Sequence, residues 1–172
     1  NILKDEFTPQ PESVLSKGVW LKRDGEKVFT FPQIDWSALG GLDLAFDLKE
    51  DDFQFSMPMG IEMINDVITK PYSAKSQPQK AELPVGQDES YLMLVDRKGK
   101  WRVNTFIKGF DTDVKGFASS YSNTGDIILI GKSPADMKVA FNEMKKMNGG
   151  ISLVEDGEVV INVPLTIAGG LY

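Results

Sequence analysis

The chain has 172 residues and contains neither His nor Cys, which removes the commonest metal ligands, general bases and thiol nucleophiles together. Its formal net charge of −6 argues against binding the phosphate backbone of a nucleic acid, which requires clustered Lys and Arg. Hydrophobic residues make up 41% of the chain, enough to build a packed core. The composition indicates a folded domain that cannot be a complete catalyst for histidine- or cysteine-dependent chemistry.

The chain shows no signal for a membrane or for export. Its apolar runs, such as Ile127 to Ile130, are far too short to span a bilayer. The polar N-terminus has no apolar signal-peptide region, and the absence of cysteine fits a reducing compartment. The sequence does not begin with Met. We therefore expect a piece of a longer, cytoplasmic protein.

The first predicted element is a hairpin near the N-terminus. Apolar residues around Trp20 and around Phe29 flank the sequence Arg-Asp-Gly-Glu at 23–26. Asp-Gly between two apolar stretches is a strong hairpin signal, because Gly tolerates the positive φ of a tight turn. Pro32 ends the pairing, and residues 33–52, with a Gly pair and an acidic run, indicate a boundary between units.

A second unit is predicted to begin near Phe53. Phe53 and Phe55 alternate with polar residues, as in a half-buried strand. Residues 61–70 fit either a strand or a helix; we favour a strand, because poor helix formers interrupt the segment and Pro71 follows it. Residues 76–90 are polar and predict a loop.

The middle of the chain predicts two further strand pairs. Residues 91–95 and 101–107 flank a polar turn and form the first pair. Residues 117–122 and 127–130 form the second pair, around the turn Asn-Thr-Gly at 123–125. The strand at 127–130 consists of Ile and Leu alone, so we expect it to be buried.

The clearest helix is predicted from Pro134 to Met147. Ser133 suits the N-cap, Pro134 the first helical position, and Asp136 gives the spacing of a capping box, while Gly149 predicts a left-handed stop. We expect the apolar face of this helix to pack on the sheet; its residues are Met137, Ala140, Phe141, Met144 and Met147.

A second Asp-Gly hairpin follows the helix, with strands at 151–154 and 159–163. The predicted fold class is therefore α+β, mainly antiparallel strands and hairpins with few helices.

Carboxylates are the remaining candidates for catalysis by side chains. They cluster at 50–52, 111–113 and 155–158. Two convergent carboxylates in a cleft could act as acid and base if burial separated their pKa values. Turn residues accompany each cluster, however, which favours solvated loops. An independent carboxylate enzyme is therefore the weakest of the alternatives.

Small hydroxyl and amide side chains gather at 118–126, between two predicted strands. Such a segment could line a pocket for a small polar ligand, although ordinary strand ends have a similar composition. Lys108, in the sequence Lys-Gly-Phe, could place a cation near a ligand or simply end a strand. The candidate pocket-facing residues are Ser120, Ser122, Asn123, Asp126 and Lys108.

Three stretches resemble known segments of one enzyme family. Residues 106–110 (FIKGF) are similar to F-V-K-G-F, and residues 117–131 (FASSYSNTGDIILIG) to A-S-S-V-A-H-D-S-H-N-I-I-V-V-G. Residues 149–171 (GGISLVEDGEVVINVPLTIAGGL) are similar to G-G-I-V-V-V-D-G-K-V-L-A-E-L-P-L-P-I-A-G-L, the longest and most specific match. All three belong to the C-terminal domain of adenine deaminases, in the amidohydrolase superfamily. A weaker similarity extends back to about residue 46, and residues 14–31 resemble the strand pair that completes a small β-sandwich beside the amidohydrolase barrel.

The resemblance implies a division into residues 1–45, the end of that β-sandwich with a linker, and residues 46–172, the C-terminal domain. It implies that an upstream (β/α)₈ barrel of the same chain converts adenine and water to hypoxanthine and ammonia. There, His and acidic residues would bind a divalent metal (manganese, iron or zinc), whereas this segment would bind no cofactor and supply no catalytic residue. The implied partners are that barrel and a purine-like small molecule, with no nucleic acid or membrane, and a homo-oligomer is left open.

One loop departs from the family pattern. Aligned on Gly131, the two His of the family fall on Ser122 and Gly125, and the Asp between them falls on Asn123. Every titratable group of that loop is lost or neutralised, while its flanking strands are kept. The substrate therefore stays open. So does an alternative in which the segment is a non-catalytic packing or oligomerisation domain of a relative with changed or lost activity.

Overall fold

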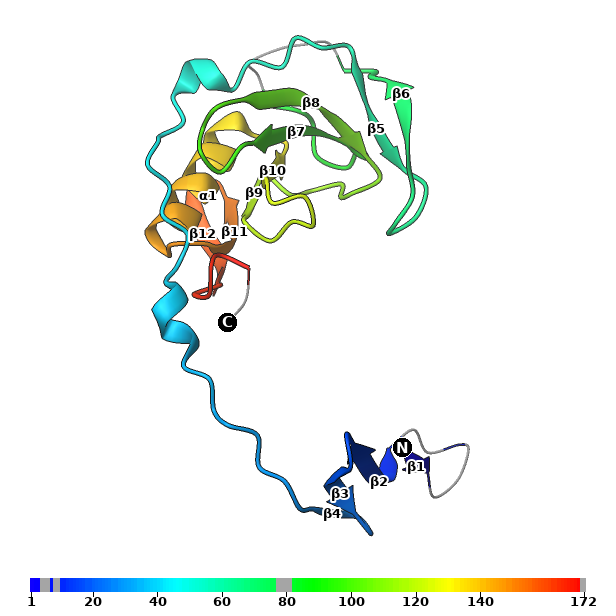
Figure 1. The fold of residues 1–172 in the computed structure, drawn as a ribbon. Coiled ribbons are helices and arrows are strands. Elements are labelled where there is room, and N and C mark those ends of the chain that lie inside the picture. The colour runs from blue at the N-terminus through cyan, green and yellow to red at the C-terminus, as the bar shows by residue number, and fades with distance from the viewer. Residues whose placement is uncertain (4–6, 8–9, 77–81, 171–172) are drawn as a thin grey trace. The chain divides into compact units, whose positions relative to one another are not determined.

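The computed structural model describes residues 1–3, 7, 10–76 and 82–170 (Figure 1). The chain divides into two compact units, Asn1–Asp35 and Trp36–Tyr172. Each unit is described by itself below.

The first unit is a four-stranded antiparallel sheet of short strands. Its strands, in order across the sheet, are β1 (Ile2–Leu3), β2 (Pro11–Ser16), β3 (Val19–Arg23) and β4 (Glu26–Lys27). The predicted hairpin at 23–26 is confirmed, since β3 and β4 are joined by Asp24 and Gly25 with φ of 50° and 86°. Among the residues described in this unit, only Ser13 is buried. The described residues of this unit therefore form no hydrophobic core of their own.

The second unit is built on one eight-stranded sheet with the order β12-β11-β9-β10-β7-β8-β5-β6 (Figure 1). Its strands are β5 (Met59–Met63), β6 (Thr69–Ser73), β7 (Glu89–Val95), β8 (Arg102–Lys108), β9 (Gly116–Ser119), β10 (Ile127–Gly131), β11 (Gly150–Glu155) and β12 (Glu158–Pro164). All neighbouring strands are antiparallel except β5 and β8, which are parallel. The α+β prediction is confirmed, as are the strand pairs β7–β8 and β11–β12.

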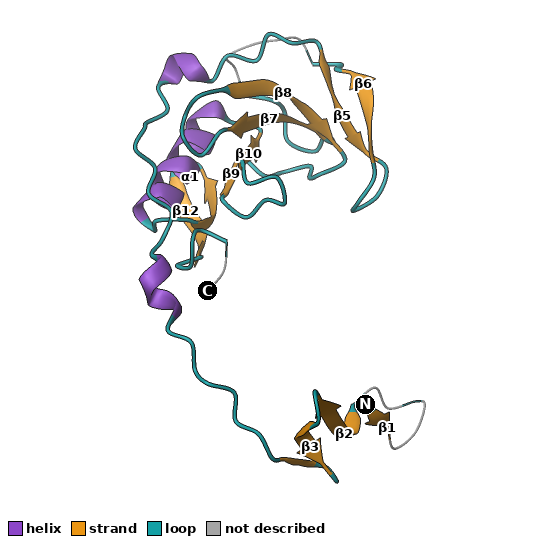
Figure 2. Cartoon of the chain, in the orientation of Figure 1, coloured by secondary structure: helices purple, strands orange, loops and turns teal. Residues whose placement is uncertain are grey.

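Helices are few. The described residues contain one α-helix, α1 (Pro134–Lys146), and two short 3₁₀ helices, η1 (Trp36–Leu39) and η2 (Glu50–Asp52) (Figure 2). Within these described segments, no helix combines the length and apolar character that crossing a membrane would require.

The start of α1 follows the sequence prediction only in part. The Ser133 hydroxyl accepts the Asp136 N–H at 3.2 Å, so Ser133 is the N-cap. The reciprocal half of a capping box is absent from this described turn. The Ser133 N–H donates to the Lys115 carbonyl, and the Asp136 carboxylate instead accepts the Gly157 N–H at 2.8 Å. Asp136 therefore ties the helix to the β11–β12 turn.

One face of the sheet is covered by α1 and by the segment at 42–55. Met137, Phe141 and Met144 are fully buried, which confirms that this face of the helix packs on the sheet. Phe141 also lies against Phe46, with ring centroids 5.8 Å apart. The strand β10 is largely buried, as predicted, with Ile127 in the same core.

Three predictions for the region before β7 need correction. Phe53 and Phe55 are buried but lie in irregular backbone after η2, because they cover the sheet and do not belong to it. Residues 61–70 are not one strand; a turn at 64–68, in which the Asn65 side chain accepts two backbone N–H groups, separates β5 from β6. The predicted loop at 76–90 ends before Glu89, and residues 77–81 lie outside the described part.

Truncating the helix face tests this packing. We expect Phe141→Ala to lower the free energy of unfolding by about 3–5 kcal/mol, because a fully buried aromatic ring leaves a cavity. The matched control is Val67→Ala, because the Val67 side chain is 89% exposed. This substitution should change the free energy of unfolding by less than about 0.5 kcal/mol. Denaturant unfolding measures both, and equal effects would contradict the packing described.

Candidate functional site

The predicted pocket-facing loop follows β9 and begins with a buried serine. The Ser120 hydroxyl donates to the Gly169 carbonyl at 2.6 Å and accepts the Gly150 N–H at 2.8 Å. The Arg97 guanidinium donates to the Ser120 carbonyl at 2.8 Å and to the Ala168 carbonyl at 3.3 Å. These contacts fasten the start of the loop to the last described residues of the chain.

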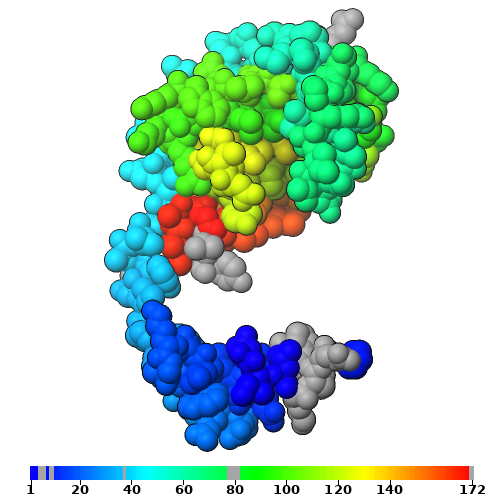
Figure 3. Space-filling model, turned by 45° about the vertical axis from the view of Figure 1, so that its right-hand side comes forward, coloured from blue at the N-terminus to red at the C-terminus, as the bar shows by residue number. Residues whose placement is uncertain are grey.

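The rest of the loop lies at the surface. Its yellow segment adjoins the red C-terminal residues in Figure 3. Asn123 is exposed, and Ser122 and Asp126 are partly exposed. The Ser122 hydroxyl lies 2.9 Å from the Thr124 hydroxyl, so it serves the local turn. The structure thus brings four candidates into one loop, of which Ser120 is engaged in internal hydrogen bonds.

Lys108 lies at the other end of the sheet. Lys108 pairs with Glu89, the first residue of β7. The loop leads into Ile127, the first residue of β10, which pairs with Val95, the last residue of β7. Six residue steps along a strand correspond to about 20 Å. Lys108 therefore does not share a site with the loop.

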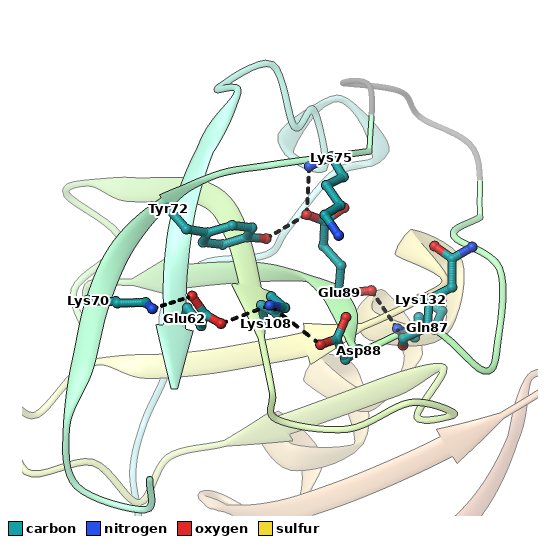
Figure 4. Close-up of polar contacts among 9 residues, drawn as sticks. All are labelled: Glu62, Lys70, Tyr72, Lys75, Gln87, Asp88, Glu89, Lys108 and Lys132. Carbon is teal, nitrogen blue, oxygen red and sulfur yellow. Dashed lines mark hydrogen bonds and ion pairs between the residues drawn. The ribbon is translucent and has the colours of Figure 1, made fainter. Parts of the chain in front are cut away.

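A chain of ion pairs surrounds Lys108 at the β5–β6 side of the sheet (Figure 4). Glu62 lies between two lysines, 2.8 Å from Lys108 Nζ and 3.0 Å from Lys70 Nζ. Asp88 is 3.8 Å from Lys108 Nζ. Hydrogen bonds from Lys108 and Lys70 hold the pKa of the Glu62 carboxyl below its ordinary value, and the bond to Glu62 raises the pKa of Lys108.

A second polar group centres on the buried Glu89. Its carboxylate accepts the Tyr72 hydroxyl at 2.7 Å and the backbone N–H groups of Lys75 and Ser76 at 2.8 and 2.7 Å. Burial alone would raise the pKa of Glu89, but the hydrogen bonds from Ser76, Lys75 and Tyr72 outweigh it and hold the pKa below its ordinary value. Burial and the bond to Glu89 raise the pKa of Tyr72 well above its ordinary value.

Lys132 is the buried cation of this region, only 1% exposed. Its Nζ donates to the carbonyls of Gln87 at 2.6 Å and Glu89 at 2.5 Å (Figure 4). Burial lowers the pKa of Lys132, against the opposing effect of nearby acidic residues, of which Asp111 is the strongest. These bonds join the end of β10 to the start of β7, so the buried polar groups serve to fix strand ends.

Sequence reasoning missed the Glu89 group. The sequence predicts a loop at 76–90 and gives no sign that Lys132 has a structural role. The hydrogen bonds of Glu89 with Tyr72 and Lys132 join residues that are 17 and 43 positions apart in the sequence. No local sequence pattern predicts contacts over such distances. Only the position of Lys132, directly after an apolar strand, hints that it is buried.

Residues of the three carboxylate clusters form ion pairs at the surface and hydrogen bonds within turns. Asp52 pairs with Arg102 at 2.9 Å, Asp156 pairs with Lys115, and the Asp111 carboxylate accepts backbone N–H groups of the adjoining turn. A groove of about 500 Å³ beside η2 and α1 is lined by the neighbouring acids Glu50 and Asp51 but by none of the five candidates. Among the described residues, no three side chains of His, Cys, Asp or Glu are placed to hold a metal ion. The donor set of the described residues therefore does not fit a catalytic metal centre.

The Glu89 group makes a prediction about stability and pH. We expect Glu89→Gln to lower the free energy of unfolding by about 1–3 kcal/mol at neutral pH, because the amide leaves buried donors unsatisfied. Since the pKa of Glu89 is lowered in the folded state, its carboxylate stabilises the fold above its ordinary value of 4.5. That contribution is lost as the pH falls through the lowered pKa, so the two proteins should converge in acid.

Unfolding titrations between pH 7 and pH 3 measure this difference. Glu158→Gln, on the exposed strand β12, is the matched control. It should leave the free energy of unfolding almost unchanged over the whole pH range. A Glu89→Gln cost that stays constant down to pH 3 would contradict the role assigned to the carboxylate.

Comparisons with known proteins identify the family of this chain. The family described as "Adenine deaminase C-terminal domain" matches residues 66–171. "Putative adenine deaminase YerA" of Bacillus subtilis is 48% identical over 171 residues, and "Putative adenine deaminase BH0637" of Halalkalibacterium halodurans is also 48% identical over 171 residues. "Adenine deaminase" of Ruegeria sp. is 29% identical over 184 residues.

Each alignment covers 98% of this chain but only 29–31% of the relative, so the chain spans about a third of the length of the proteins it matches. The family match alone covers more than half of the chain and takes in α1 and all strands from β6 to β12. The chain belongs to the adenine deaminase C-terminal domain family.

Proposed function

We propose that this chain is the C-terminal part of a longer metal-dependent hydrolase that converts adenine and water to hypoxanthine and ammonia. The observation that carries the proposal is the family match, together with relatives named adenine deaminase that are about three times as long. The adenine-binding and catalytic groups belong to an upstream barrel of the same polypeptide. In keeping with the absence of cysteine, we propose a cytoplasmic location.

The proposed division of labour follows from what the segment lacks. Water is too weak a nucleophile to displace the amino group of a purine unless a metal lowers its pKa. The chain contains neither imidazole nor thiolate, and among the residues that the structure describes no three acids are grouped to hold a metal ion. We therefore assign the metal (manganese, iron or zinc) to the upstream barrel and a supporting role to this segment.

Residues 1–45 are proposed to complete a β-sandwich of the upstream part, and residues 46–172 to form the C-terminal domain. The first compact unit supports this, because it has 35 residues and no Cys, and no apolar residue described in it is buried. Chains below about 40 residues usually need disulfides, a metal or a partner to fold. Its exposed Phe29, Phe31 and Ile34 need a partner surface.

A second candidate function is that the parent acts slowly on adenine or on a different substrate. The observation that favours it is the loop at 121–126, where Ser122, Asn123 and Gly125 stand at the positions of ionisable residues in the family. The loop is anchored by Ser120 and Arg97 and keeps its flanking strands. The loop is thus kept while three of the family's ionisable positions have lost their titratable groups, and Asp126 is the carboxylate that it retains.

The proposal predicts that the segment alone releases no ammonia from adenine and holds no stoichiometric transition metal. The measurements are an ammonia assay at high protein concentration and elemental analysis, on a sample whose folding is verified by circular dichroism. The full-length protein is the positive control. Turnover by the isolated segment that survives chelation and repurification, or one tightly held zinc, iron or manganese per chain, would defeat the proposal.

The altered loop makes a separate prediction about the full-length protein. General acid–base groups contribute about 10²–10⁴-fold to a rate. If the family's histidines do such work, the parent should deaminate adenine more slowly than relatives that keep them. The double substitution Ser122→His with Gly125→His should then raise kcat. The matched control is Thr124→His, which adds an imidazole to the same exposed turn at a position where the family has none. An ordinary adenine deaminase rate that the double substitution leaves unchanged would show that the loop has no catalytic role.

A further inference from the structure

The eight-stranded sheet has one face that α1 leaves uncovered. The helix packs against the face that carries Ala118, Leu129 and Val154. The opposite face carries a second hydrophobic cluster, centred on Leu92 and Ile130. No other α-helix is described in this unit, and α1 lies on the first face only (Figure 2).

Strand register aligns the side chains of the uncovered face in two rows across six strands, from β12 to β8. The first row is Val163, Ile151, Ser119, Ile128, Leu94 and Val103. The second row is Ile161, Leu153, Phe117, Ile130, Leu92 and Thr105. We call these twelve residues the two-row surface; ten are apolar and none is charged.

The two-row surface is buried at its centre and exposed at its ends. Leu92 and Ile130 are 3% exposed, whereas Ile161 is 50% exposed and Val163 and Val103 are 40% exposed. Large contiguous apolar surfaces are uncommon on isolated soluble domains and mark sites of interaction. The area left for a partner lies around this buried centre, on residues that are partly exposed: Ile151, Leu153, Phe117, Ile128 and Leu94.

We propose that the two-row surface is the docking site of the upstream catalytic part of the full-length chain, an inference that rests on the proposed function. The relatives place about 70% of their length outside the part matched here, so a large partner is carried on the same polypeptide. A tethered partner meets the surface at an effective concentration in the mM range, which a second copy does not reach in dilute solution.

The position of the altered loop supports the same occupant. Ser119, in the first row, is the last residue of β9, and Ile128 of the same row directly follows the first residue of β10. The loop at 120–126 therefore projects from the edge of the two-row surface. A catalytic part docked there meets the loop, which gives a physical reason for keeping the loop although the family's ionisable groups are gone from positions 122, 123 and 125.

Cysteine labelling of the full-length protein tests this proposal. The segment contains no Cys, so each introduced thiol is the only one in its peptide and mass spectrometry can follow it. Val163→Cys and Val103→Cys probe the two ends of the surface. Val159→Cys is the matched control, because Val159 lies on the same strand as Val163, pairs with the core residue Val154 on the helix-covered face, and is 42% exposed.

We expect iodoacetamide to modify Val163→Cys and Val103→Cys at least about tenfold more slowly than Val159→Cys in the native protein, since a thiol under a docked domain reacts only through opening. All three should react equally in denaturant. Equal native rates would overturn the proposal. Protection that disappears on dilution, together with a dimer-to-monomer change in sedimentation, would assign the surface to a second copy and also overturn it.

Adenine turnover by the same variants separates the two proposals. Protection at both probes without ammonia release would leave the docking site standing and defeat the proposed activity. Ordinary turnover with unprotected probes would defeat the docking site alone.

Discussion

The structure depends on one constraint: an eight-stranded sheet has two faces, and a single helix can cover only one of them. The buried side of α1 and the segment at 42–55 both pack on the same face, where they bury Phe55, Met93 and Phe141. The other face keeps an apolar surface across six strands. Apolar area exposed to water is unfavourable, and this face is therefore the one on which the proposed docking of another part of the protein rests.

Elements with a strong local signal could be predicted from the sequence. Gly25 and Gly157 have positive φ in the two predicted Asp-Gly turns, and Ser133 caps the predicted helix. The errors arose where distant contacts decide the outcome. Phe53 and Phe55 alternate like strand residues, yet they are held against Tyr91 and the core without joining a ladder. Pro71 argues against a helix at 61–70, and it lies in β6, an edge strand, where a missing N–H is tolerated.

The candidate site shows the same limit. Grouping Ser120, Ser122, Asn123 and Asp126 required only sequence proximity, and they do share a loop. Adding Lys108 required knowledge of strand direction, and β8 carries it to the far end of the sheet. The hydrogen bonds of Ser120 with Gly150 and Gly169 could not be predicted, because they join three segments distant in sequence. Whether the loop faces a ligand stays a prediction.

The central claim is that this domain supplies shape while the chemistry and the missing apolar contacts come from the upstream part. Determining the structure of the full-length protein with its metal bound tests that claim most directly. The account predicts metal ligands drawn wholly from outside residues 1–172, and upstream residues packed on Ile128, Leu94 and Val103. A metal held by carboxylates of this segment, or a two-row surface open to solvent, would contradict it.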